Sequence, residues 1–122
     1  QRQMCIRDRY KISNAITKDD IALTFAKNSG STEPTYYSDK VTTPAIRLYA
    51  KGTLTVGAKT GKIITISKIT LKFGDGDKTN AITPDVDKFE SPTWTGSANS
   101  IKFTIGGTKD HRRIAGVEIT YK

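Results

Sequence analysis

The residues of this sequence whose types can perform covalent chemistry stand in no recognisable catalytic pattern. The only histidine, His111, allows no His-rich metal site and completes no visible Ser-His-Asp triad. The only glutamates, Glu33, Glu90 and Glu118, occur in no motif that would set two carboxylates across a cleft, as glycoside hydrolysis requires. No glycine-rich phosphate loop joins a strand to a helix. We therefore expect a protein that is not an enzyme and that uses no cofactor.

An acidic turn comes nearest to a metal site. The segment GDGDKTN (74–80) carries Asp75, Asp77 and Asn80, and oxygen ligands on alternating residues can wrap Ca²⁺. The spacing of an EF-hand fails, because the segment lacks the glycine at the sixth position and the glutamate at the twelfth. An acidic hairpin turn is the favoured interpretation. No metal site is predicted, and weak Ca²⁺ binding by this turn stays open.

Aromatic side chains are the stronger candidates, for ligand binding without a covalent step. Trp94 is the only tryptophan and lies among small residues in TWTGS, where an exposed ring could stack on a sugar. The alternative is a tryptophan buried in the core or at a sheet edge. Tyr36 and Tyr37 lie in a polar segment before Asp39, so two rings and a carboxylate could meet a sugar at a loop tip. The alternative there is that one tyrosine anchors the loop.

Two arginines complete the predicted binding set. Arg47 shares a strand face with Tyr49, where it could contact a ligand or cover apolar surface with its stem. Arg112 belongs to the basic run HRR (111–113), which could contact phosphate or an acidic polysaccharide. The alternative is a basic entry to a strand that Asp110 partly neutralises. The predicted ligand-binding residues are thus Trp94, Tyr36, Tyr37, Arg47 and Arg112.

The elements that must position these side chains are short strands. Apolar and polar residues alternate in IALTFAK (21–27), KGTLTVGA (51–58) and SIKFTIGG (100–107), and no segment of ten residues keeps a helical period well. Strands recur every 8–12 residues with glycine at the turns, which is typical of a sandwich or barrel. The segment ISKITLKF changes parity at Ser67-Lys68, which predicts a β-bulge. The pattern predicts an all-β antiparallel sandwich.

The charge of the chain is spread rather than concentrated. The 122 residues fit one domain and carry a formal net charge of +8. Removing residues 1–9 removes three arginines and one aspartate, which leaves +6. The lysines come singly, as on solvated strands, and form no dense tract of the kind that binds nucleic acid. We therefore do not expect a nucleic-acid partner. No apolar run approaches the roughly 18 residues of a membrane span, so we expect no membrane insertion.

The first nine residues, QRQMCIRDR, differ from the rest of the chain. They hold the only cysteine and the only methionine, and no turn signal connects them to the following segment. They resemble the peptide obtained when sequencing-adapter DNA is translated at the edge of a gene. The alternative is a basic tether with a reactive Cys5. We predict that residues 1–9 are a non-native or disordered extension and that residues 10–122 form a single β-sandwich domain.

Residues 20–122 resemble a known module. RLYAKGTLTV, ISKITLKF and SPTWTGSANSIKFTIGGTKDHRRIAGVEITYK, in this order, are similar to a β-sandwich module of secreted and surface multi-domain proteins from Bacteroidetes-type bacteria. The resemblance implies a jelly-roll-like fold, secretion or cell-surface display, and other domains of a parent protein as partners. It also implies a non-catalytic binding or accessory role, with a glycan or another cell-surface polymer as the favoured ligand. The alternatives are a structural spacer or anchoring domain and, less favoured, a basic nucleic-acid-binding domain.

Overall fold

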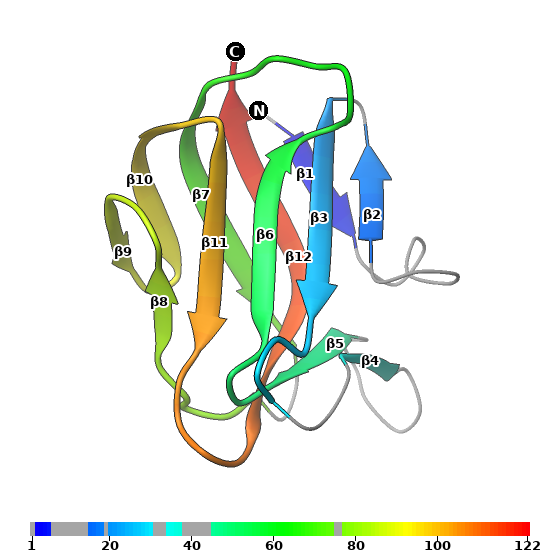
Figure 1. The fold of residues 1–122 in the computed structure, drawn as a ribbon, viewed down its shortest axis with the longest axis vertical. Helices are drawn as coiled ribbons and strands as arrows, with labels where there is room; N and C mark the ends of the chain where they lie inside the picture. Colours follow the sequence, from blue (N-terminus) through cyan, green and yellow to red (C-terminus); the bar gives the residue numbers. More distant parts are fainter. Residues whose placement is uncertain (1, 6–14, 19, 31–33, 38–44, 75–76) are drawn as a thin grey trace.

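The computed structural model describes residues 2–5, 15–18, 20–30, 34–37, 45–74 and 77–122, and in these ranges the chain consists of strands and their connections (Figure 1). The strands are short, as the alternating sequence predicts. In chain order they are β1 (Arg2–Cys5), β2 (Ala15–Lys18), β3 (Ile21–Ala26), β4 (Thr35–Tyr37), β5 (Ala45–Tyr49), β6 (Thr53–Ala58), β7 (Ile66–Phe73), β8 (Ile82–Pro84), β9 (Lys88–Glu90), β10 (Thr93–Ala98), β11 (Ser100–Ile105) and β12 (His111–Tyr121).

The strands form two antiparallel sheets packed face to face. The seven-stranded sheet has the order β4-β5-β12-β7-β10-β9, with β1 paired beside β12, and the five-stranded sheet has the order β2-β3-β6-β11-β8. In Figure 1 the strands β3, β6 and β11 of one layer lie in front of β12 and β7 of the other. The all-β antiparallel sandwich predicted from the sequence is confirmed.

The hydrophobic core lies between the two sheets. Antiparallel sheets with one solvated face bury every second side chain of a strand. Burial of that apolar face, worth about 25 cal/mol per Å² removed from water, is the main force that holds the layers together. On β3 and β11 the buried residues alternate with exposed or half-buried ones, and they are Ile21, Leu23, Phe25, Ile101, Phe103 and Ile105.

A β-bulge on β7 lies where the sequence changes parity. Thr120 of β12 pairs with Lys68. Its neighbour Tyr121 pairs with Ile66, so Ser67 is an extra residue on β7. The Ser67 hydroxyl donates a hydrogen bond to the Thr120 carbonyl at 3.3 Å. The bulge keeps apolar side chains on both sides of Ser67 in the core, and the prediction of a bulge here is confirmed.

The first described strand pairs with the middle of the last one. In the antiparallel pair of β1 and β12, Arg2 lies opposite Ile119 and Cys5 opposite Gly116. Because β7 covers the other edge of β12, β1 and β5 follow one another along the same edge. The sequence pattern did not predict this strand. Backbone pairing says nothing about the origin of residues 1–9, so their non-native character stays a prediction.

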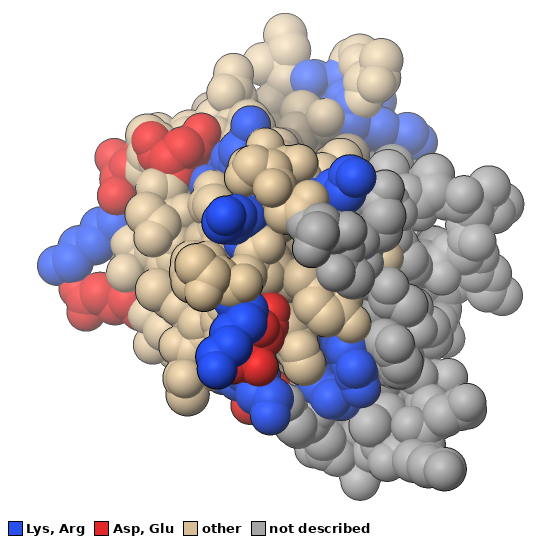
Figure 2. Space-filling view, turned by 60° about the horizontal axis from the view of Figure 1, so that its bottom comes forward, with Lys and Arg blue, Asp and Glu red and all other residues tan. Residues whose placement is uncertain are grey.

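Charged side chains are distributed over the surface in separate groups. Seen from the end of the sandwich where β4 and β5 lie, Lys and Arg side chains form several distinct patches (Figure 2). Asp and Glu side chains gather on one side of this view and beside one of the basic patches. The described part of this face therefore carries no continuous basic track of the kind that follows a nucleic-acid backbone.

Candidate binding site

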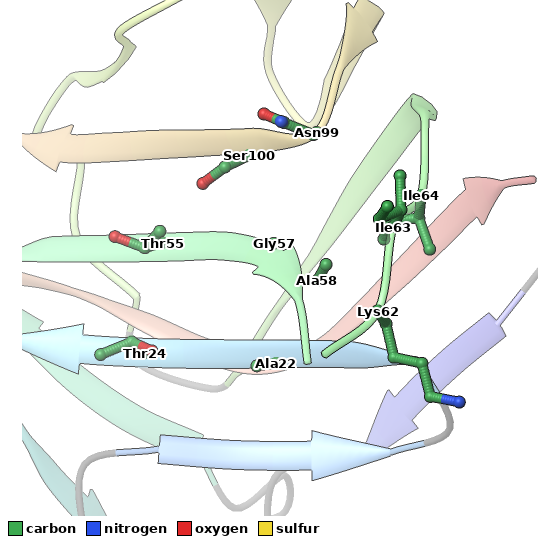
Figure 3. Close-up of a pocket in the computed structure, with 10 residues that line it drawn as sticks. All are labelled: Ala22, Thr24, Thr55, Gly57, Ala58, Lys62, Ile63, Ile64, Asn99 and Ser100. Atoms are coloured by element: carbon green, nitrogen blue, oxygen red, sulfur yellow. The ribbon is translucent and has the colours of Figure 1, made fainter. Parts of the chain in front are cut away.

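An open groove lies on the outer face of the five-stranded sheet (Figure 3). It has a volume of about 340 Å³, and residues of β3, β6 and β11 form its floor. Side chains alternate across a strand, so the residues that line the floor are those between the buried core positions. One face of the five-stranded sheet thus packs into the hydrophobic core, and the opposite face forms the floor of the groove.

The floor of the groove is low because three of the smallest residues lie in one row. Ala22 of β3 lies opposite Gly57 of β6, and Gly57 lies opposite Ser100 of β11. A Cβ atom on Gly57 would lie only 3.1 Å from the Ser100 Oγ, closer than ordinary van der Waals contact. Glycine at this position therefore lets Ser100 lie against the backbone of β6. The next row carries the hydroxyls of Thr24 and Thr55.

One wall of the groove is the segment between β6 and β7. At one end a turn holds Gly61 at a φ of +84°, a left-handed conformation that glycine adopts without strain. At the other end Thr65 and Lys122 exchange two backbone hydrogen bonds of 2.9 and 3.0 Å. Between these anchors Ile64 is buried in the core and Ile63 is 97% exposed. The wall therefore presents an apolar side chain to any ligand in the groove.

The groove offers hydrogen bonds and one apolar contact. Thr24, Ser100 and Asn99 are exposed and Thr55 is half-buried, so hydroxyl and amide groups line the site. A hydroxyl both donates and accepts, and an amide does the same with two groups. Ile63 adds apolar surface at the wall. The arrangement suits a ligand that is rich in hydroxyls and has one apolar face.

The charged side chain at the rim of the groove, that of Lys62, points away from the groove. The Lys62 side chain extends away from Thr55 and Ser100 in Figure 3, and its Nζ lies 3.9 Å from the Asp20 carboxylate. Both side chains are largely in water, so this ion pair contributes little to stability. Among the described residues that line the groove there is no carboxylate and no aromatic ring. The described lining therefore offers a ligand neutral polar groups and the apolar side chain of Ile63.

Trp94, predicted to stack on a sugar, is buried in the core. Its side chain is 0% exposed, and its indole N–H donates a hydrogen bond of 2.8 Å to the Val86 carbonyl. On β10 it lies opposite Ile69 of β7 and Phe89 of β9. A ring enclosed on all sides offers no face to a ligand. This correction removes Trp94 from the binding set and gives it the core role that was its alternative.

Tyr36 and Tyr37 belong to a strand rather than to a loop tip. Their backbones lie opposite Ile46 and Ala45 of β5, in β4 at the edge of the seven-stranded sheet. The loop position expected for them is thereby corrected. Their side chains and Asp39 lie outside the described part of the structure. The expectation that the two rings bind a sugar stays a prediction.

Arg112, predicted to contact a ligand, is held within the protein. Its Nε lies 3.1 Å from each carboxylate oxygen of Asp77, and a terminal nitrogen lies 3.0 Å from one of them. The other terminal nitrogen donates a 2.7 Å hydrogen bond to the Asn80 carbonyl. The guanidinium also lies 4.3 Å from the centre of the Phe73 ring, and the side chain is 12% exposed. This correction makes Arg112 a structural residue that ties the acidic turn to β12.

The same contacts account for the described part of the acidic turn. Asp77 accepts a further hydrogen bond of 2.7 Å from the Arg113 backbone N–H. The Asn80 side chain donates to two backbone carbonyls at 3.0 and 2.8 Å. Asp75 lies outside the described residues. Among those described, no group of three or more His, Cys, Asp or Glu side chains is placed to hold a metal ion, and Asp77 is engaged by Arg112.

A second group of polar side chains lies on the outer face of the seven-stranded sheet. The register places Arg47 of β5 opposite Arg113 of β12, and Tyr49 opposite His111. The Tyr49 and His111 rings meet edge to face, with centroids 5.4 Å apart and planes at 62°. Arg113 Nε donates a hydrogen bond of 3.2 Å to His111 Nε2. We call these four residues the basic cluster.

Within the basic cluster, the environment of His111 favours its neutral form. Burial lowers the pKa of His111, and the positive charges of Arg113, Arg47 and Lys78 lower it further. Asp110 opposes this shift to a smaller degree. The hydrogen bond from Arg113 acts in the same direction, since an imidazole that accepts at Nε2 is unprotonated there. The unfolded chain therefore takes up a proton at this residue more readily than the folded chain.

We expect the stability of the protein to fall as the pH drops from about 7.5 to about 5.5, through the unfolded histidine pKa of about 6.5. The sign follows because a proton taken up preferentially by the unfolded state favours unfolding. Thermal unfolding followed by circular dichroism at several pH values measures this effect. In the His111→Gln variant the fall over this range should be clearly smaller. An equal fall in variant and wild type would assign the effect to other groups.

None of the groove residues was among the predicted site residues. One sequence signal was available, because the adjacent Ile63 and Ile64 cannot both face the core in an extended segment. Gly57 within a strand is a second signal, since glycine there often marks a close approach. The register between strands, which puts Ala22, Gly57 and Ser100 in one row, could not be predicted from the sequence.

Comparison of the chain with protein-family models, with curated proteins and with solved structures gives no match. The residues described by the structure include no helix long and apolar enough to cross a membrane. A function for this protein therefore has to be argued from the groove and the basic cluster themselves.

Proposed function

We propose that this protein is a non-catalytic binding module and that it holds a glycan or another cell-surface polymer in the groove of the five-stranded sheet. The observation that carries the proposal is the composition of the groove. Hydroxyl and amide groups lie over a floor of small residues, beside an isoleucine that is 97% exposed.

A sugar polymer matches these groups in chemistry. Sugar hydroxyls donate and accept hydrogen bonds, and so do the hydroxyls of Thr24, Thr55 and Ser100. The C–H face of a sugar ring is apolar and can pack against Ile63. The groove lies on the surface and half of the residues that line it are exposed, so a long chain can be held without threading through the protein.

The amino-acid composition supports an exported setting. Residues 10–122 contain no cysteine, so a domain of this composition meets an oxidising compartment without forming unwanted disulfides. We accordingly propose that the module works in a secreted or cell-surface protein of bacterial origin, alongside other domains of that protein. Nucleic acid is a less favoured partner, because the basic side chains on the described part of the end face form separate patches.

A structural spacer is the second candidate function, and a specific observation favours it. Trp94 and Arg112, two of the residues predicted to touch a ligand, serve the packing of the sandwich instead. A spacer would position neighbouring domains and would hold nothing in the groove. The two candidates therefore differ in whether changes confined to the groove alter binding.

A glycan-array screen of the full chain tests the proposal, with the groove altered by Thr24→Gln or Ile63→Ser. The longer glutamine side chain fills the groove, and the serine removes its apolar wall. We expect binding to a hit glycan to weaken roughly tenfold or more in either variant, which corresponds to about 1.4 kcal/mol. Both positions are exposed, so the unfolding temperature should change little.

Thr104→Gln is the matched control for the groove. Thr104 is an outward-facing threonine of β11 on the same sheet, and it does not line the groove. The control variant should bind as the wild type does. Absence of binding to every glycan on the array, or an equal loss of binding in Thr24→Gln and Thr104→Gln, would reject the groove as a glycan site and favour the structural spacer.

A further inference from the structure

The basic cluster is a feature that the proposed groove does not use. Arg47 and Arg113 lie directly opposite one another on antiparallel strands, a position in which like charges destabilise a sheet. Among the described residues Arg113 takes part in no ion pair. Its guanidinium hydrogen-bonds the imidazole of His111, a partner without negative charge. The cluster thus holds positive charge that Arg113 shares with no described carboxylate.

The surroundings of the cluster add to its positive charge. Lys78 and the two arginines all act on His111 as positive charges, and Asp110 is the acid that acts on it. Arg112 differs from its neighbour Arg113 because the Asp77 carboxylate pairs with its guanidinium on the core side of β12. Consecutive residues of a strand point to opposite faces, so one arginine is satisfied internally and the next faces outward.

The geometry also fixes the cluster before any ligand arrives. Asp77 accepts the backbone N–H of Arg113 at 2.7 Å and so holds this part of β12 in place. His111 is 7% exposed and packs against the edge of the Tyr49 ring, so the imidazole that accepts from Arg113 is itself held. A guanidinium positioned in this way loses less conformational freedom when it binds an anion.

We propose that Arg113, with Arg47 beside it, binds an oxyanion, the carboxylate or sulfate group of an acidic polysaccharide. Guanidinium groups bind such groups through paired, charge-assisted hydrogen bonds. A single cluster suits one anionic group at a time, whereas a nucleic acid needs contacts along a run of phosphates, and the end view of the molecule shows separate basic patches (Figure 2). In taking the ligand to be a polysaccharide, this inference rests on the proposed function.

Binding of defined polymers to the full chain tests the inference. The probes are polygalacturonate for carboxylate, heparin for sulfate, dextran as a neutral polymer and single-stranded DNA for phosphate. We expect one of the two acidic polysaccharides to bind more tightly than dextran and DNA. Arg113→Gln should weaken that binding at least tenfold. Lys68→Gln, which removes the same charge from an exposed site elsewhere on the seven-stranded sheet, should leave it within about twofold.

The imidazole of His111 gives a readout that needs no variant. His111 is the only histidine, so its ring signals in a proton NMR spectrum have one assignment. A bound oxyanion adds negative charge near a ring that otherwise faces Arg113, Arg47, Lys78 and Asp110. The His111 signals should therefore shift on addition of the acidic polysaccharide, and its pKa should rise.

Three results would overturn the inference. They are an absence of binding to both acidic polysaccharides, equal weakening by Arg113→Gln and Lys68→Gln, and tighter binding to DNA than to either polysaccharide. Failure here is distinguishable from failure of the proposed function. Loss of neutral-glycan binding in Thr24→Gln would uphold the groove even if Arg113→Gln had no effect.

Discussion

Replacing Trp94 by alanine should destabilise the protein by about 3–5 kcal/mol, the range for removing a large aromatic side chain from a core. The ring is 0% exposed and belongs to the hydrophobic core, and Trp94 lies between Ile69 of β7 and Phe89 of β9 in the sheet. The substitution also leaves the Val86 carbonyl without the indole N–H that lies 2.8 Å away. Since small domains are stable by only about 5–15 kcal/mol, this loss should be visible as a large shift in a urea unfolding curve.

Trp94→Phe separates the two contributions. A phenyl ring retains most of the packing but cannot donate to Val86, so its cost should be about 1–3 kcal/mol. At a temperature where the Phe variant is folded, glycan binding should match the wild type. A variant of normal stability that had lost glycan binding would instead show that the Trp94 ring meets the ligand, contrary to its burial in the structure.

Removing the carboxylate of Asp77 should be nearly as damaging. Asp77→Ala leaves the guanidinium of Arg112 without its charged partner and the Arg113 N–H without its acceptor. We expect a loss of about 2–4 kcal/mol, below the roughly 3–5 kcal/mol of a fully buried pair, because the two side chains retain 12% and 18% exposure. Urea unfolding of the variant and the wild type at neutral pH measures the difference.

An exposed ion pair provides the control for this prediction. Lys88 and Glu90 lie 2.7 Å apart with side chains 74% and 73% exposed, and water screens such a pair. Glu90→Gln should leave the urea midpoint unchanged although the ion pair is as short. In the double variant Asp77→Ala with Arg112→Ala, the loss should be smaller than the sum of the single losses. Strict additivity would show that the two residues do not act on one another.

The sequence was informative where a single strand carries the signal. Alternation along β3 and β11 predicted which residues face the core, because the period of a strand depends on the local backbone alone. The parity change at Ser67 predicted the bulge on β7 for the same reason. The all-β antiparallel class followed from the repetition of such segments, and the structure confirms it.

The sequence was uninformative where a role depends on distant partners. The local sequence around Trp94 does not show whether its ring is exposed or buried, because its burial depends on the pairing of β10 with the strands that carry Phe89 and Ile69. Arg112 was assigned to a ligand because its counter-ion, Asp77, lies 35 residues away in the chain. The local view also placed Arg112 and Arg113 in one basic run, although successive strand residues face opposite sides.

The position of β12 in the fold has a consequence for how the chain is made. With eleven residues β12 is the longest strand, and it lies between β5 and β7 in the seven-stranded sheet. Its partners β5 and β7 precede it in the sequence and do not pair with one another in this sheet. During synthesis on the ribosome both strands therefore emerge before β12, and the edge of each that pairs with β12 is at first unpaired. Until β12 has emerged, the nascent chain exposes strand edges and apolar residues that invite aggregation, so this sheet cannot complete its pairing before β12 is available.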